Sequence, residues 1–243
     1  MKIARNITDL SIQNYKRVTI AMVIFAVATG ALIPLIKVDT DPENMLGKTE
    51  PVRVFHDETK ERFDLNDIVV VGVVNEQNPD GVFNIQSLSD IYELTRYAKE
   101  ELRWPDKKDP SRTVGVVEID LMAPSTVDHI GQGGPGVVTF EWLMPKPPTT
   151  QEEALAVRDK ILSNPMLRDT LVSGDGKALA LYLPLTSKDL SYRVYSALQK
   201  KVAEFSGQDR YHITGLPVAE DTFGVEMFVQ MAISAPLAML VIF

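Results

Sequence analysis

The chain has 243 residues, a formal net charge of −8, 45% hydrophobic residues and no cysteine. This length allows one ordinary domain, or two small ones, beyond any membrane segment. The lack of cysteine excludes a disulfide framework, a thiolate metal site and a cysteine nucleophile. The acidic balance gives no support to a nucleic-acid partner, which would require a clustered basic face.

The first predicted element is a transmembrane helix at Val18–Ile36. This stretch holds no ionisable residue, and Lys16, Arg17 and Lys37 flank it closely. About 19 residues at 1.5 Å each would span roughly 28 Å, close to the ~30 Å hydrocarbon core of a bilayer. A cleaved signal peptide and a buried core helix are the alternatives, and both usually have shorter apolar runs.

Residues 1–17 form a basic leader in which Asp9 is the single acid, whereas acids dominate just beyond the span. The positive-inside bias therefore places the N-terminus in the cytoplasm. Ile3, Ile7 and Leu10 recur at i, i+4 and i+7, so the leader is either an amphipathic helix at the inner membrane interface or a frayed tail.

Residues 37–66 are predicted to be a membrane-proximal linker followed by a short helix that is entered through Pro51. Acids occupy positions 1, 3, 5 and 12 of a notional EF-hand loop. However, Asn44 replaces the glycine at position 6 and Pro42 stiffens position 4, so we expect no calcium site. The four acids are Asp39, Asp41, Glu43 and Glu50.

Residues 67–217 are predicted to form an α+β domain. The β-branched run Ile68–Val74 predicts a buried strand. The 3.6-residue period of Leu88–Leu102 predicts a helix, with Asn84 as its N-cap and Trp104–Pro105 as its stop. Alternation over Val114–Leu121 predicts a second strand, which would complete a β-α-β unit.

A second unit follows in the same domain. Thr150 and Glu153 form a capping box that opens a helix. Asp175–Gly176 is a hairpin signal leading into a strand at Lys177–Leu185. The apolar period then predicts a helix over Leu190–Phe205, and the closing cap and strand are Gly207 and Tyr211–Thr214.

Two consecutive strand-helix-strand units are the order of a ferredoxin-like, split β-α-β fold, with the helices on one face of a sheet. Many unrelated proteins share this order, so the fold alone says little about activity.

The segment Ala123–Pro148 is predicted to be a mobile loop, because it contains clusters of glycine and proline, which interrupt regular structure. A phosphate-binding loop would end in Gly-Lys-Ser/Thr, whereas Gly136 is followed by Val137 and Val138. Substrate or partner contact is the alternative role for this segment.

Residues 218–243 are predicted to be a junction followed by the start of a second transmembrane helix, because Met227–Phe243 carries no charge. No cationic flank follows it, so we expect the chain to be part of a longer membrane protein. The acids Glu220, Asp221 and Glu226 could feed protons or attract cations, but solvated acids near a helix start are the simpler interpretation.

No catalytic constellation can be assembled. His56, His129 and His212 lie far apart without metal-ligand spacing, and no nucleophile elbow or HExxH pair occurs. We therefore expect neither an enzyme nor a cofactor.

Together these segments resemble exporters of the resistance-nodulation-division (RND) superfamily, particularly the MMPL-type branch. The resemblance covers nearly the whole chain in the family's order. Its features are the basic leader and first span, then DTDPENML, FDLNDIVVVGVV, DGVFNIQSL, PPTTQEEALAVRDKILSNPMLRDTLVSGDGKALALYLPL and ITGLPVAEDTF.

The resemblance implies the N-terminal part of a proton-driven exporter in the bacterial inner membrane. Its periplasmic porter domain would handle hydrophobic or amphiphilic molecules such as lipids. The implied partners are the bilayer, the remaining transmembrane half and further copies of the chain. The family's proton-relay acids lie in later helices, beyond Phe243, so none is assigned here.

The alternative is a membrane-anchored extracytoplasmic binding or sensor module without transport activity. An envelope enzyme is a more distant third, since no nucleophile, metal site or cofactor motif is recognisable.

Overall fold

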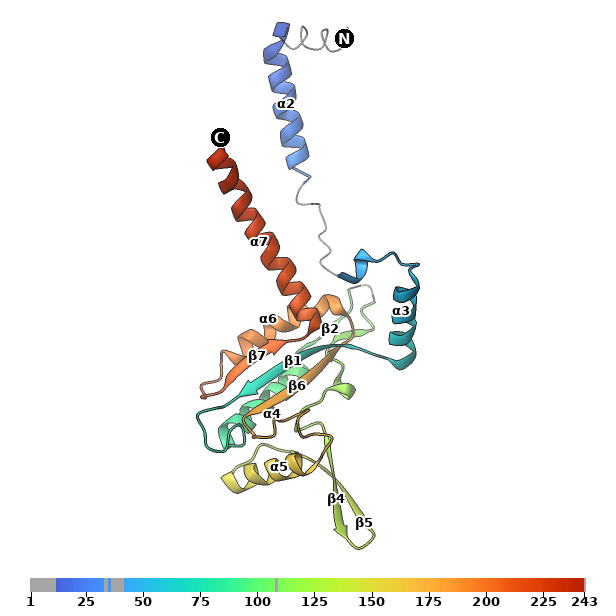
Figure 1. Ribbon diagram of the computed structural model, residues 1–243, viewed down its shortest axis with the longest axis vertical. Coiled ribbons are helices and arrows are strands. Elements are labelled where there is room, and N and C mark those ends of the chain that lie inside the picture. The colour runs from blue at the N-terminus through green and yellow to red at the C-terminus, as the bar shows by residue number, and fades with distance from the viewer. Residues whose placement is uncertain (1–11, 33–34, 36–41, 108, 243) are drawn as a thin grey trace. The chain divides into compact units, whose positions relative to one another are not determined.

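The computed structural model describes residues 12–32, 35, 42–107 and 109–242 (Figure 1). The chain divides into two compact units, Met1–Asp39 and Thr40–Phe243. Residues 1–11 of the predicted leader, which hold its apolar period, and the first two acids of the linker lie outside the described residues.

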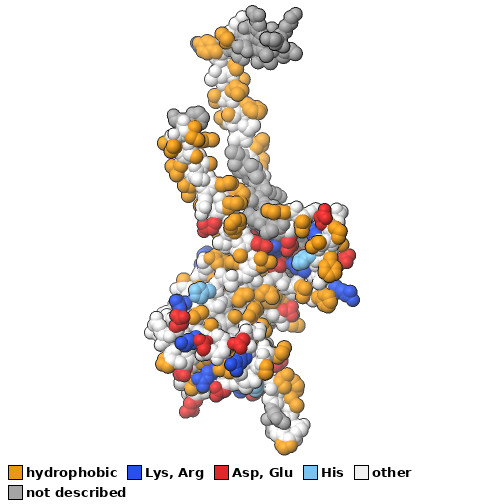
Figure 2. Space-filling view, in the orientation of Figure 1, with side chains coloured by type: hydrophobic (Ala, Val, Ile, Leu, Met, Phe, Trp, Pro, Cys, Tyr) orange, Lys and Arg blue, Asp and Glu red, His pale blue; other side chains and the backbone are white. Residues whose placement is uncertain are grey.

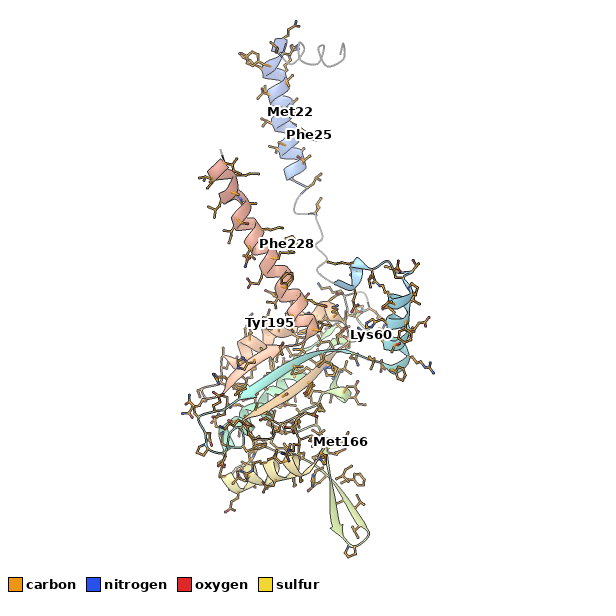
Figure 3. All side chains as sticks on the ribbon, in the orientation of Figure 1. Met22, Phe25, Lys60, Met166, Tyr195 and Phe228 are labelled. Carbon is orange, nitrogen blue, oxygen red and sulfur yellow. The ribbon has the colours of Figure 1, made fainter. Side chains whose placement is uncertain are left out.

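The first unit contains helix α2, Tyr15–Gly30, in which no residue is buried. From Val18 onward its side chains are apolar apart from Thr19 and Thr29, and Figure 3 shows Met22 and Phe25 standing away from the helix axis. The predicted span Val18–Ile36 continues past α2 into residues that the structure does not describe, so α2 accounts for its first part only.

An antiparallel sheet of three strands organises the second unit. The strands are β1 (Asp67–Val74), β6 (Ala178–Leu185) and β7 (Arg210–Thr214), in the order β6-β1-β7. Val71 pairs with Leu181 on one side of β1 and with Ile213 on the other. The predicted strands at 68–74, 177–185 and 211–214 are therefore confirmed to within a residue.

One face of this sheet is buried. Val69, Val71 and Val73 point to it and are all inaccessible, whereas Ile68 on the opposite face is 40% exposed. Since the side chains of a strand alternate between its two faces, the apolar core lies on one side of the sheet.

Helices α4 (Ile85–Glu100) and α6 (Ser191–Val202) contribute their apolar stripes to that single core. Helix α5 (Gln151–Ser163) adds Ala154, Val157 and Ile161. The unit is thus an α+β structure with small antiparallel sheets (Figure 1).

The helix caps follow the sequence signals in part. Asn84 accepts from the Ser87 amide at 2.9 Å, and Thr150 Oγ1 accepts from the Glu153 amide at 3.2 Å, so both predicted N-caps are confirmed. The predicted cap at Gly207 is wrong, because α6 ends five residues earlier and its C-cap is Ala203. Helix α4 ends at Glu100, before the predicted stop at Trp104–Pro105, and these two residues belong to a strand.

Helix α3 (Pro51–Phe63) has the predicted proline in its first turn and none of its residues is buried. A 3-10 helix at Pro42–Met45 precedes it. The Arg53 guanidinium joins the two by donating to the carbonyl oxygens of Glu43 and Leu46, each at 2.8 Å.

The predicted strand Val114–Leu121 is wrong over most of its length. Strand β3 is limited to Thr113–Gly115 and pairs with β2 (Arg103–Pro105), and a 3-10 helix occupies Glu118–Asp120. The segment still lies along the free edge of β6 through isolated bridges from Val116 to Leu185 and from Met122 to Tyr182. The 3-10 helix interrupts regular pairing between these two bridges.

The predicted mobile loop Ala123–Pro148 is also wrong, because it contains the hairpin of β4 (Asp128–Gly134) and β5 (Val137–Trp142). Ile130 pairs with Phe140, and the register shifts near the glycine-rich end. The hairpin projects from the body of the unit (Figure 1).

Helix α7 (Leu216–Ile242) ends the described chain. By length and composition it is the one helix among the described residues that is long and apolar enough to cross a membrane. Its apolar window has no burial against the rest of the protein, and Figure 2 shows hydrophobic side chains over much of this helix.

Candidate functional site

A groove of about 770 Å³ lies where the edge of the sheet is irregular. It is bounded by the end of α4, the β2–β3 hairpin, the 3-10 helix at Glu118–Asp120 and the base of the β4–β5 hairpin. Its lining residues are Lys99, Arg103, Thr113, Val114, Val116, Val117, Glu118, Ile119, Ser125, Thr126, Trp142, Pro145 and Thr186.

The backbone near Gly115 shapes one wall of this groove. Gly115 has a φ of +133°, and a Cβ there would lie 2.1 Å from the carbonyl oxygen of Leu102. The glycine therefore lets two chain segments approach closely. Thr186 fixes the turn from the other side, since its Oγ1 accepts from the Gly115 amide at 3.0 Å and its amide donates to the Gly115 carbonyl at 2.9 Å.

Most of the groove wall is apolar. Ile119 is 90% exposed on the 3-10 helix, and Trp142 is 54% exposed at the end of β5. They offer a surface that an apolar ligand could cover, with a gain of about 25 cal/mol for each Å² removed from water.

A charged triad marks the groove near α4. The Glu118 carboxylate lies 3.0 Å from Lys99 Nζ and 2.7 Å from Arg103 Nη1. The hydrogen bond and positive charge of Lys99, helped by Arg103, lower the pKa of Glu118. The triad carries one net positive charge, so it favours the polar or anionic end of a ligand over a cationic end.

One hydroxyl group of the groove is already occupied by local hydrogen bonds. Thr126 is engaged locally, because its Oγ1 lies 2.6 Å from the Leu121 carbonyl oxygen and accepts from the Ala123 amide at 2.9 Å. Among the lining residues there is no histidine and no hydroxyl paired with a carboxylate base. The arrangement can hold an amphiphile with its apolar part against Ile119 and Trp142.

The structure separates the three histidines considered from sequence. His56 is on α3, with Nε2 3.7 Å from the Glu43 carboxylate, while His129 is on β4 and His212 is exposed on β7. Within the described ranges, no group of three or more histidine and acidic side chains has metal-binding geometry.

The acids before the second apolar stretch lie on α7 itself. Lys188 Nζ is 2.6 Å from Glu220 Oε2 and 3.5 Å from Glu43 Oε1, and the Glu220 side chain is only 13% exposed. The interpretation of Glu220 as a solvated acid is therefore wrong. Glu226, by contrast, is exposed.

Asp221 ties the base of α7 to the start of α6. Its carboxylate is hydrogen-bonded to the hydroxyl of Ser191, a fully buried residue that also lies 3.3 Å from the Pro217 carbonyl oxygen. These contacts, together with the Lys188–Glu220 pair, form a polar junction between α7 and the α+β body.

Sequence reasoning singled out the segment Ala123–Pro148 as a place for substrate contact, and the two ends of that segment line the groove. It missed the triad of Lys99, Arg103 and Glu118. A feature of the sequence that could have indicated this groove is Ile119, an apolar residue between two acids in a segment predicted to be a strand.

No protein-family model matches the chain, and no curated protein matches its sequence.

Proposed function

We propose that this chain is the N-terminal part of a proton-driven exporter of the RND superfamily, of the MMPL type. In this proposal the α+β unit is an extracytoplasmic porter domain that handles hydrophobic or amphiphilic molecules. Two transmembrane helices flank it, the second being α7, and the protein is located in the bacterial inner membrane.

The apolar helices support the membrane part of this proposal. α7 is long enough to cross a bilayer, and it carries Pro236 in its interior, a residue more frequent in transmembrane helices than in soluble ones. The exposed apolar surface of α2 would be costly in water and is suited to lipid.

The sheet topology supports a ferredoxin-like fold for the domain. Strand β1 lies between β6 and β7 and is antiparallel to both, and α6 connects β6 to β7. The bridged segment at Val116 and Met122 runs where the fourth strand of such a sheet would lie.

The observation that carries the proposed activity is the groove of about 770 Å³, which joins an apolar wall to a charged triad. An amphiphile likewise has an apolar part and a polar or charged part. Apolar grooves with a few placed polar groups are the common form of small-molecule sites.

A fluorescence titration tests this activity. The chain has two tryptophans, so Trp104→Phe leaves Trp142 of the groove as the single reporter. We expect a long-chain fatty acid brominated on its chain to quench Trp142 saturably when added to the full chain in lipid nanodiscs. Ile119→Arg places a charge on the apolar wall and should weaken binding about tenfold, equivalent to 1.4 kcal/mol.

Ile130→Arg is the matched control, because Ile130 is 61% exposed on β4 and does not line the groove. It should leave the affinity unchanged within a factor of two. Equal weakening by both substitutions, or no quenching at all, would contradict amphiphile binding in this groove.

The polar junction favours a second candidate, a membrane-anchored binding or sensor module. Ser191–Asp221 and Lys188–Glu220 couple α7 directly to the domain, as signalling across a membrane would need. Protease protection and membrane extraction of the native full-length product would distinguish one or two anchors from the helix bundle of an exporter.

A further inference from the structure

A second groove, of about 540 Å³, has a composition that differs from the first. It lies between the end of α4, strand β2 and the outer side of α6. Its lining residues are Tyr97, Glu101, Leu102, Trp104, Tyr192, Arg193, Ser196, Ala197 and Lys200. Three aromatic rings and two cations therefore face one space.

Arg193 is held in position by stacking. Its guanidinium carbon lies 3.7 Å from the centre of the Trp104 ring, well within cation–π range. Stacking uses the face of the guanidinium and leaves its N–H groups, which lie in the plane, free to donate at its edge. The side chain is thus pre-ordered without its hydrogen-bonding capacity being used.

Neither cation of this groove has an acidic partner within ion-pair distance among the residues that the structure describes. This distinguishes Arg193 and Lys200 from Lys99 and Arg103, which both contact Glu118 in the first groove. Glu101 also lines the second groove, so its three charged side chains carry a net charge of +1 if Glu101 is ionised.

We propose that this second groove binds a phosphate group, either in the headgroup of an anionic lipid or in a soluble phosphate ester. A planar guanidinium fork matches two phosphate oxygens, and Lys200 supplies a second, point-like positive charge. Trp104, Tyr97 and Tyr192 offer flat surfaces for the glycerol or sugar carbons attached to the phosphate.

The lipid source follows from the position of α6, and this step alone rests on the proposed membrane insertion of α7. Ser191 at the start of α6 contacts Asp221, and Asp221 precedes the apolar stretch at Met227 by roughly 9 Å of helix rise. The headgroup layer on each side of a bilayer is about 5–8 Å thick. Tyr192 and Arg193 would therefore lie close to the headgroups.

The two grooves share no lining residue. Arg103 lines the first groove and Trp104 the second, as expected for consecutive residues that point to opposite faces. Phosphate binding in the second groove therefore does not require an amphiphile in the first.

Isothermal titration calorimetry of the full chain in uncharged detergent tests the proposal. The probes are glycerol 3-phosphate, dihexanoylphosphatidylglycerol and dihexanoylglycerol, which lacks phosphate. Binding of both phosphate compounds, but not of dihexanoylglycerol, indicates a site for phosphate itself. Binding of dihexanoylphosphatidylglycerol alone indicates a lipid headgroup site. Equal binding of dihexanoylglycerol, or no binding by any probe, would overturn the proposal.

Matched variants locate the site. Arg193→Gln should weaken phosphate binding at least tenfold, and Arg193→Lys should weaken it less, because lysine keeps the charge but loses the fork. Arg168→Gln removes the same charge from an exposed position outside this groove and should stay within twofold of the parent. Equal phosphate affinities of the Arg193→Gln and Arg168→Gln variants would refute the assignment. The Ile119→Arg variant should still bind phosphate even if it no longer binds an amphiphile, which separates this proposal from the one for the first groove.

Discussion

At the scale of single residues, the most unusual side chain is Asp90 on α4. It is only 6% exposed, and its Oδ1 accepts from Gln86 Nε2 at 2.9 Å. Its Oδ2 is buried without a hydrogen-bond partner among the described residues. The nearby Asp209 accepts from Asn75 and Ser87 at Oδ1, while its own Oδ2 is likewise buried without a partner among the described residues. Burial, and then the negative charge of Asp209, raise the pKa of Asp90.

We predict that Asp90→Asn stabilises the protein at pH 8 and not at pH 4. Because the pKa of Asp90 is higher in the folded state, the folded protein binds this proton more tightly than the unfolded chain does. Stability from this group is therefore present at low pH and is lost as the pH rises through the folded pKa. Asparagine avoids the buried charge and keeps an acceptor for Gln86, so we expect a gain of about 1 kcal/mol in unfolding free energy at pH 8. Denaturant unfolding at both pH values checks this, and an equal gain at both would contradict it.

Gly115 is the residue on which the wall of the first groove depends. In Gly115→Ala, the new Cβ would overlap the Leu102 carbonyl at a positive φ. We expect a loss of about 3 kcal/mol in unfolding free energy. Urea unfolding followed by tryptophan emission measures this.

Gly47→Ala is the control for that substitution, because its Cβ would meet only Glu50 Cγ, at 3.7 Å. It should change the unfolding free energy by less than about 0.5 kcal/mol. Similar losses for the two variants would show that the close approach at Gly115 is not what fixes this wall.

At the scale of elements, the β4–β5 hairpin differs from the main sheet because every residue of β5 is exposed. Phe140 is 73% exposed in the middle of β5, whereas Leu143, just after the strand, is 1% exposed and donates its amide to the Val127 carbonyl at 3.0 Å. The hairpin is therefore anchored at its base and unsupported along its length.

This contrast predicts the effect of truncating two large side chains. Leu143→Ala should cost about 2–5 kcal/mol of unfolding free energy through the cavity that it leaves. Phe140→Ala should stay within about 0.5 kcal/mol, since it removes little buried contact. Thermal or urea unfolding of both variants measures the difference, and a large cost for Phe140→Ala would mean that the hairpin packs against something in solution.

The sequence predicts elements well where one face is buried. β1, α4 and α6 were predicted because burial of one side imposes a period of 2.0 or 3.6 on the apolar residues. None of the hairpin residues whose burial the structure describes is fully buried, so no apolar period marks the β4–β5 hairpin, and its glycines suggested a loop. The segment Val114–Leu121 alternates like a strand, but the positive φ at Gly115 and the 3-10 helix redirect it.

The grooves were harder to predict, because segments that are distant in the sequence come together to form them. The first one combines α4, two short strands, a 3-10 helix and Thr186, which is distant in sequence. Which of these segments meet is set by pairing across the edge of β6, as between Val117 and Pro184. Local patterns carry no information on such contacts, so the segment Ala123–Pro148 could be singled out but the charged triad could not.

At the scale of the whole molecule, charge and apolar surface are divided along the chain. The net charge is −8, yet Met227–Phe243 holds no ionisable residue. The acids Glu220 and Asp221 at the base of α7 are engaged by Lys188 and Ser191. The helix thus leaves the α+β body through a polar junction and then continues without an ionisable residue from Met227, as expected of a helix that enters a bilayer.

Site-directed labelling tests the central claim, that the α+β domain lies outside a membrane which the N-terminal segment crosses. The chain has no cysteine, so Gln13→Cys and Ser163→Cys each introduce a single exposed thiol. In bacterial spheroplasts that produce the full chain, a membrane-impermeant maleimide should label the Ser163→Cys variant at once. It should label the Gln13→Cys variant only after the membrane is permeabilised. Immediate labelling of both variants, or protection of the Ser163→Cys variant, would contradict the account.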